Sequence, residues 1–90
     1  MERKRTRMDI MHDILKSVQD KGGEIKKTHL MYKANLSHNQ MKIYLNELMN
    51  SGLLESKNSE KKNSIIITKK GRNFFSQYKQ VMEFEKTFGL

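Results

Sequence analysis

Residues Ser37 to Gly52 carry the signals for both ends of one helix, and this segment constrains the fold more than any other. Ser37 is followed three residues later by Gln40, the spacing of a capping box, and Gly52 stands where helices often end in a left-handed residue. On a helical wheel, one side is apolar and the opposite side carries amides and one cation. The apolar side contains Met41, Tyr44, Leu45 and Leu48, and the opposite side contains Asn39, Lys42, Ile43, Asn46 and Asn50.

The polar side of this helix indicates DNA as a partner. Amides and cations hydrogen-bond to base edges and phosphates, and asparagine is suited to a bidentate contact with adenine. We therefore expect Asn39, Lys42 and Asn46 to face the major groove. His38 follows the cap by one residue, where its imidazole can touch a phosphate, and protonation would strengthen that contact.

Length and charge are consistent with this expectation. A chain of 90 residues with 36% hydrophobic residues forms one small domain with a limited core. The net charge of +8 favours a polyanionic partner, although many small soluble proteins are also basic. The absence of cysteine excludes disulfides and thiolate metal sites. With no apolar run long enough to span a membrane, we expect a cytoplasmic, nucleoid-associated protein without membrane contact.

Two further helices are expected before Ser37. Apolar residues at helical spacing predict the first from about Thr6 to Asp20, and Gly22 and Gly23 then end it. Around Ile25 there is room for at most a small edge strand. A second helix from about Lys27 to Ala34 follows, and its short turn into Ser37 predicts a helix-turn-helix.

The pattern changes to strands after Gly52. Residues 53–57 and the isoleucine-rich residues 64–68 are typical of two strands, separated by the loop N-S-E-K-K-N. A hairpin with a basic tip after a helix-turn-helix is a wing, and Lys61 and Lys62 are its candidate DNA contacts. Lysines at such tips also serve solubility alone, so this alternative stays open.

Further phosphate contacts are expected outside the helix and the wing. Lys26 and Lys27 precede the second helix, and Arg3, Lys4, Arg5 and Arg7 form a basic arm at the N-terminus. Such arms either lie along DNA or remain idle.

Thr68 is a good N-cap for a last helix that runs from about Lys69 to Phe88. Its first part, with Phe74 and Phe75, is needed to close the core. A helix of this length is about 30 Å long and projects past a small domain, so its distal apolar stripe is expected to form a two-fold dimer. The alternative is that the helix bends back over the first helix. The candidate dimerisation residues are Tyr78, Val81, Met82, Phe84 and Phe88.

The predicted fold is mainly α with a small β-hairpin, a winged helix-turn-helix with a long C-terminal helix. Its expected parts are a basic arm (1–7), the winged domain (8–78) and the distal, dimerising part of the last helix (79–90). Strings in four places resemble the small archaeal winged-helix regulators, including the chromatin-type DNA-binding dimers of crenarchaea. They are L-M-Y-K-A-N-L-S, Y-L-N-E-L, S-G-L-L-E and T-K-K-G-R-N-F, starting at Leu30, Tyr44, Ser51 and Thr68.

This resemblance implies a DNA-binding dimer joined by its C-terminal helices. The residues that match the recognition positions are Ser37, His38, Asn39, Lys42 and Ile43. The sequence departs from the pattern in its amide-rich outer face and in the charged residues Glu83, Glu85 and Lys86, which interrupt the apolar seam.

No catalytic constellation, cofactor motif or small-molecule site is evident, so we do not expect an enzyme. His12, His29 and His38 lie on different predicted elements, and neither a nucleophile motif nor a phosphate loop is present. The main hypothesis is a double-stranded DNA binder that regulates transcription or organises chromatin. A protein-interaction module that uses the same face is the alternative. Single-stranded nucleic acid is disfavoured because the proximal aromatic residues are needed for packing.

Overall fold

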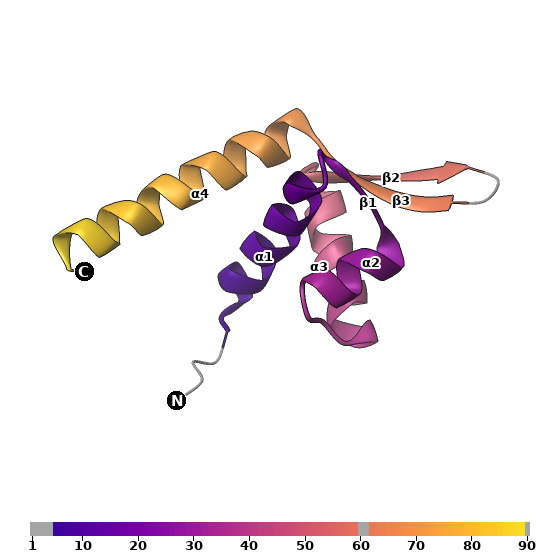
Figure 1. The fold of residues 1–90 in the computed structure, drawn as a ribbon, viewed down its shortest axis with the longest axis horizontal. Coiled ribbons are helices and arrows are strands. Elements are labelled where there is room, and N and C mark those ends of the chain that lie inside the picture. Colours follow the sequence, from indigo (N-terminus) through magenta and orange to yellow (C-terminus); the bar gives the residue numbers. More distant parts are fainter. Residues whose placement is uncertain (1–4, 60–61, 90) are drawn as a thin grey trace.

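The computed structural model describes residues 5–59 and 62–89, which form helices and short strands (Figure 1). Three helices and a short strand precede a hairpin, and a long helix follows it. In order, the elements are α1 (Arg7–Asp20), β1 (Glu24–Lys26), α2 (Lys27–Lys33), α3 (His38–Asn50), β2 (Leu54–Ser59), β3 (Lys62–Ile67) and α4 (Lys69–Phe88). This is the winged helix-turn-helix arrangement that the sequence predicts.

The strands form one antiparallel sheet in the order β1-β3-β2. Ile65 of β3 lies opposite Ile25 on one side and Ser56 on the other. Ile25 and Ile65 are both buried, so the single apolar residue of β1 is sufficient to hold this short edge strand against the core. The small edge strand expected around Ile25 is therefore present.

Helix boundaries follow the capping residues. Thr6 and Ser37 each form a capping box, and Thr68 accepts a hydrogen bond from the Gly71 amide at the start of α4. After α3, Gly52 has a φ of +77°, which is the left-handed stop expected there. Local signals thus place the start of each of these three helices to within a residue.

The strands of the wing differ from their predicted limits. β2 begins at Leu54 and continues to Ser59, while β3 begins at Lys62 and ends at Ile67, leaving Thr68 as a cap. The expected loop of residues 58–63 was too long, because backbone pairing continues through polar residues such as Asn58 and Asn63. The backbone hydrogen bonds between the two strands do not require apolar side chains where both faces of the hairpin are exposed to water.

The core lies where α1, α2 and α3 meet one face of the sheet and the start of α4. Its fully buried members come from most of these elements, which joins them into one cluster. The largest are Ile14, Leu15, Val18, Leu30, Leu48 and Leu54.

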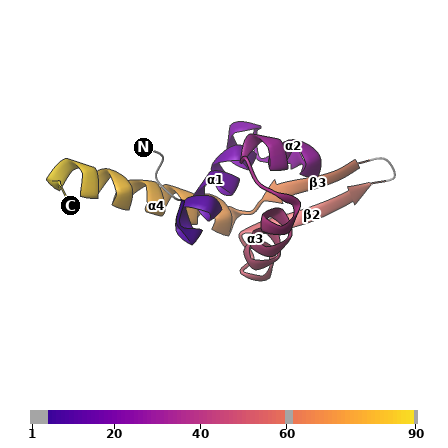
Figure 2. The same ribbon diagram turned by 90° about the horizontal axis from the view of Figure 1, so that it is seen from below.

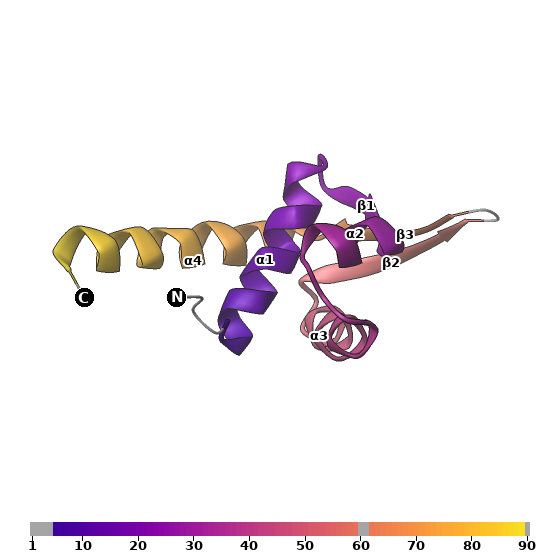
Figure 3. The same cartoon turned by 60° about the horizontal axis from the view of Figure 1, so that its bottom comes forward.

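The wing and α4 extend from this body in opposite directions (Figures 1 and 2). The molecule measures 49 × 30 × 21 Å along its principal axes, and α4 contributes much of the long dimension. Viewed from a third side, α3 lies beneath β2 and is seen nearly end-on (Figure 3). α4 does not bend back over α1, so the projecting arrangement predicted from its length is the one observed.

Candidate nucleic-acid interface

α3 has one buried face and one exposed face, divided as its helical wheel predicts. Met41, Leu45 and Leu48 are buried in the core. On the opposite side the side chains of Asn39, Lys42, Ile43, Asn46 and Asn50 are exposed. Ile43 is 56% exposed, which leaves its side chain accessible to a partner.

The turn from α2 into α3 has a defined backbone. Asn35 adopts a left-handed conformation with a φ of +54°, which asparagine tolerates better than most residues. The amide of Leu36 donates to the carbonyl of Met31 at 3.0 Å, and the Leu36 side chain is buried. The start of α3 is therefore held against the body by both hydrogen bonding and packing.

A hollow lies between α2 and the outer face of α3. It brings together five predicted contact residues that come from both helices, and it adds Thr28 and Met31, which the sequence did not single out. Those two residues follow Lys27 by one and four positions, a helical spacing that places them on one side of α2. The lining residues are Lys27, Thr28, Met31, His38, Asn39, Met41, Lys42 and Asn46.

Two predicted residues flank this hollow without lining it. Ser37 is the N-cap of α3, and its side chain accepts from the Gln40 amide, so its primary role is structural. Ile43 lies further round the exposed face of the helix. Lys26 is exposed at the end of β1 and precedes α2 without a side-chain capping bond.

Part of the predicted wing contact lies outside the described residues. This applies to Lys61, whereas Lys62 is the first residue of β3. Lower on the wing, Lys57 of β2 lies 3.8 Å from a carboxylate oxygen of Glu24. Both side chains of that pair are largely exposed, so the attraction is screened by water and the lysine remains accessible.

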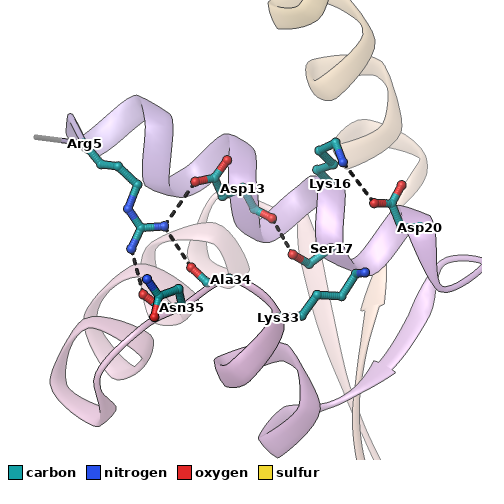
Figure 4. Close-up of a pocket in the computed structure, with 8 residues that line it drawn as sticks. All are labelled: Arg5, Asp13, Lys16, Ser17, Asp20, Lys33, Ala34 and Asn35. Carbon is teal, nitrogen blue, oxygen red and sulfur yellow. Dashed lines mark hydrogen bonds and ion pairs between the residues drawn. The ribbon is translucent and has the colours of Figure 1, made fainter. Parts of the chain in front are cut away.

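Arg5 and Arg7, which the sequence assigns to a basic arm, are both bonded to the body of the protein. Arg3 and Lys4 lie outside the described residues, but Arg7 is the first residue of α1 and pairs with Glu47 of α3 at 2.7 Å. Arg5 is hydrogen-bonded to Asp13 and to the backbone of the α2–α3 turn (Figure 4). The sequence pattern missed these contacts because the partners of Arg5 and Arg7 are distant in sequence.

The distal residues of α4 divide into two groups. Val81, Phe84 and Phe88 are 53%, 57% and 65% exposed, and the rings of Phe84 and Phe88 are in contact, with centroids 4.6 Å apart. Tyr78 instead lies against the body, with its ring 5.2 Å from that of His12. Met82 is 42% exposed and lines a hollow with His12. The five candidate dimerisation residues therefore do not form a single stripe.

His12 occupies the junction between α1 and α4. Burial lowers the pKa of its imidazole, since the charged form loses hydration there, and nearby Asp13 opposes the shift by attraction. Among the described residues, no hydrogen-bond partner is found for the buried Nε2 atom. This environment favours a neutral packing residue.

Exposed aromatic residues are more numerous than expected. Tyr32 on α2 is 78% exposed, and Phe84 and Phe88 are also at the surface. The packing argument against single-stranded nucleic acid holds for Phe74, Phe75 and Tyr78 but does not cover these three. Tyr32 is a lone exposed ring on its helix, whereas single-strand binding relies on successive stacking rings.

Within residues 5–59 and 62–89, no three histidine, cysteine or acidic side chains are grouped in a way that could hold a metal ion. None of the helices in this part of the chain is both long and apolar enough to cross a bilayer.

A family model described as winged helix-turn-helix matches residues 4–86. No curated protein matches the sequence. Among solved structures, the DNA-binding protein Sso10a-2 from Sulfolobus solfataricus superposes with a TM-score of 0.81 and is 24% identical, covering 93% of this chain and 85% of its own.

Two further structures show the same fold. A winged-helix DNA-binding protein from STIV has a TM-score of 0.77 and 19% identity, over 93% of this chain and 95% of its own. A MarR family transcriptional regulator from Silicibacter pomeroyi has a TM-score of 0.71 and 17% identity, over 81% of this chain and 50% of its own. These comparisons confirm the resemblance to small winged-helix proteins and the predicted fold.

Proposed function

The chain belongs to the winged helix-turn-helix family, and on that premise we propose that it binds double-stranded DNA as a transcriptional regulator or a chromatin protein. The observation that carries this proposal is the surface of α3 and the adjoining hollow. Residues from two helices converge there, and alongside Met31 and Met41 they are two cations, two amides, a histidine and a hydroxyl. None of the residues lining the hollow is a carboxylate, so nothing on it repels phosphate.

In the proposed complex, α3 lies in the major groove. Asn39 and Asn46 read base edges, Lys42 contacts a base or a phosphate, and His38 contacts a phosphate near the start of the helix. Lys27 lines the hollow from the start of α2, and in the complex it contacts the backbone that borders the groove. Lys26 and the wing residues Lys61 and Lys62 reach the adjacent phosphates or the minor groove.

Affinity and selectivity are divided between these parts. α3 carries one lysine and no arginine, so most of the electrostatic attraction comes from the surrounding cations. Its amides contribute mainly to the choice of site. Neutralising roughly six to ten phosphates per complex would make the affinity fall steeply with salt.

We further propose that the protein acts as a homodimer joined by the distal part of α4. Val81, Phe84 and Phe88 form an exposed apolar stripe on a helix that projects from the body. Covering this stripe with the same stripe of a second copy removes apolar surface from water. Such a dimer presents two copies of α3 to one duplex.

The DNA proposal is tested by titrating a fluorescent duplex at several salt concentrations. The wild type is expected to give a steep negative slope of log K against log salt. Changing Asn39, Lys42 and Asn46 together to alanine should weaken binding and flatten this slope by about one unit for each protomer that contacts the DNA, because each protomer loses one cation.

A matched control changes Ser76 to alanine on the exposed surface of α4, and it should bind like the wild type. A flat salt dependence in the wild type would overturn DNA binding and favour the protein-interaction module. A steep slope that the triple change leaves intact would move recognition away from α3.

A further inference from the structure

Arg5 is bonded to the turn that joins α2 to α3 (Figure 4). Its Nη1 donates to the carbonyl of Ala34 at 2.8 Å and to Oδ2 of Asp13 at 3.1 Å, and its Nη2 donates to the carbonyl of Asn35 at 2.7 Å. The side chain is 31% exposed. One guanidinium therefore joins α1, the end of α2 and the residue that turns the chain toward α3.

The two carbonyls that Arg5 binds belong to Ala34, the C-cap of α2, and to Asn35, the residue that follows it. Earlier carbonyls of α2 are used within the turn, where Met31 accepts from the amide of Leu36 and Tyr32 accepts from the amide of Asn35. A cation at this position also interacts favourably with the C-terminal end of the α2 dipole. Arg5, which lies outside the turn in the sequence, thus donates hydrogen bonds to two carbonyl groups of the turn.

The turn determines where α3 begins. Asn35 is held in a left-handed conformation, and the capping residue Ser37 follows two positions later. The guanidinium of Arg5 also pairs with Asp13 of α1. Because α1 contributes residues to the core, this pair connects the turn to the body of the protein. A change at Arg5 therefore alters the entry of α3 relative to the body without touching the outer face of that helix.

We propose that Arg5 is a positioning residue for α3 and not a phosphate contact. The inference rests on the proposed DNA binding, and it assigns Arg5 a role different from that of the arm in which the sequence places it. A phosphate contact would require Arg5 to leave three charge-assisted or carbonyl hydrogen bonds. Its effect on DNA binding then comes from the angle at which α3 presents Asn39 and Asn46.

The test compares Arg5→Lys and Arg5→Ala with the wild type. Lysine keeps the charge that a phosphate contact needs, but its compact ammonium does not reproduce the rigid fork that spans three acceptors. Under the positioning role, both variants bind duplex DNA about 5–30-fold more weakly, the effect of one or two kcal/mol. The slope of log K against log salt stays within a few tenths of the wild-type slope.

Amide hydrogen exchange in the free protein provides a second readout. The amides of Asn35 and Leu36 should exchange several-fold faster in both Arg5 variants, because the turn has lost its external donors. Lys33→Ala is the matched control. Lys33 and Arg5 line one hollow between α1 and the end of α2 (Figure 4). The loss of Lys33 removes one charge without removing a donor to either carbonyl, so the exchange of both amides should not change.

Three results would overturn the proposal. One is wild-type DNA affinity in Arg5→Lys together with a slope reduced by about one unit in Arg5→Ala, which identifies a phosphate contact. Another is unchanged exchange at Asn35 and Leu36 in both variants. The third is unchanged DNA affinity in both.

Failure of the wild type to bind any duplex would reject the DNA function separately, and the exchange comparison would still decide whether Arg5 orders the turn. If Arg5→Ala does not fold, Arg5→Lys carries both measurements, with circular dichroism as the check on its fold.

Discussion

The imidazole of His12 stacks on the ring of Phe75, with ring centroids 4.9 Å apart and ring planes 20° apart. This contact joins α1 to α4 at the point where α4 leaves the body. The stack and the neighbouring ring of Tyr78 are among the contacts that connect the projecting helix to the core. The protonation state of His12 therefore bears on how firmly α4 is attached.

Folding stability is predicted to fall as the pH drops below 6.5, the ordinary pKa of histidine. Burial lowers the pKa of His12 in the folded protein, so the unfolded chain takes up a proton first, and stability is lost between 6.5 and the lower folded-state value. Above 6.5 both states are mainly neutral at this position and the effect disappears. Urea unfolding at a series of pH values measures the decline.

His12→Phe should remove this part of the decline, because it retains an aromatic ring against Phe75 but has no titrating group. His29→Gln, on the exposed surface of α2, is the control and should keep the decline. An identical pH dependence in His12→Phe and the wild type would show that another group is responsible.

Gly71→Ala is predicted to destabilise the protein by about 1–3 kcal/mol, the usual cost of overpacking. A Cβ at this position would overlap the carbonyl oxygen of Leu53 and lie 2.8 Å from Cγ1 of Ile67. In a helix, alanine is more favourable than glycine by about 1 kcal/mol. The sign of the change in the free energy of unfolding therefore shows whether the packing clash or the helix propensity dominates. Ser76→Ala, exposed on the same helix, should change the free energy of unfolding by no more than about 0.5 kcal/mol. A Gly71→Ala protein as stable as the wild type would contradict the close approach.

The proposed dimer predicts that Phe84→Asp is monomeric in sedimentation experiments. A carboxylate in the middle of the stripe of Val81, Phe84 and Phe88 would have to be buried without a partner in the dimer. Ser76→Asp adds the same charge to an exposed position about 120° around the helix from that stripe, and it should remain dimeric. Equal masses for the two variants would place the interface elsewhere.

Ile43 is predicted to contact thymine methyl groups. It is the large apolar side chain on the exposed face of α3, beside amides suited to adenine. Replacing thymine by uracil in the duplex should weaken wild-type binding about fourfold per methyl group contacted, if each buried methyl contributes about 0.8 kcal/mol. Ile43→Ala should bind both duplexes equally well, whereas Ile43→Val should retain part of the difference. A uracil effect of the same size in Ile43→Ala would exclude this contact.

Much of this protein was determined by local sequence. The capping bonds of Ser37 and Thr68 and the left-handed turn at Gly52 involve backbone groups only a few residues away, so the limits of α3 and the start of α4 could be predicted. The two faces of α3 likewise follow from helical periodicity. The predicted contacts Lys27, His38, Asn39, Lys42 and Asn46 converge on one hollow because the order of elements specified a helix-turn-helix.

Tertiary structure decided the features that depend on residues far apart in the chain. Arg5 and Arg7 belong to a basic run in the sequence, but their partners Asn35 and Glu47 are 30 and 40 positions away. Helical periodicity places Met82 at least about 100° around α4 from Val81, Phe84 and Phe88, but only the crossing of α1 and α4 brought Met82 to a hollow with His12. Residue charge and helical periodicity indicate which interactions a side chain can form, whereas the tertiary fold determines which partners lie close enough to form them.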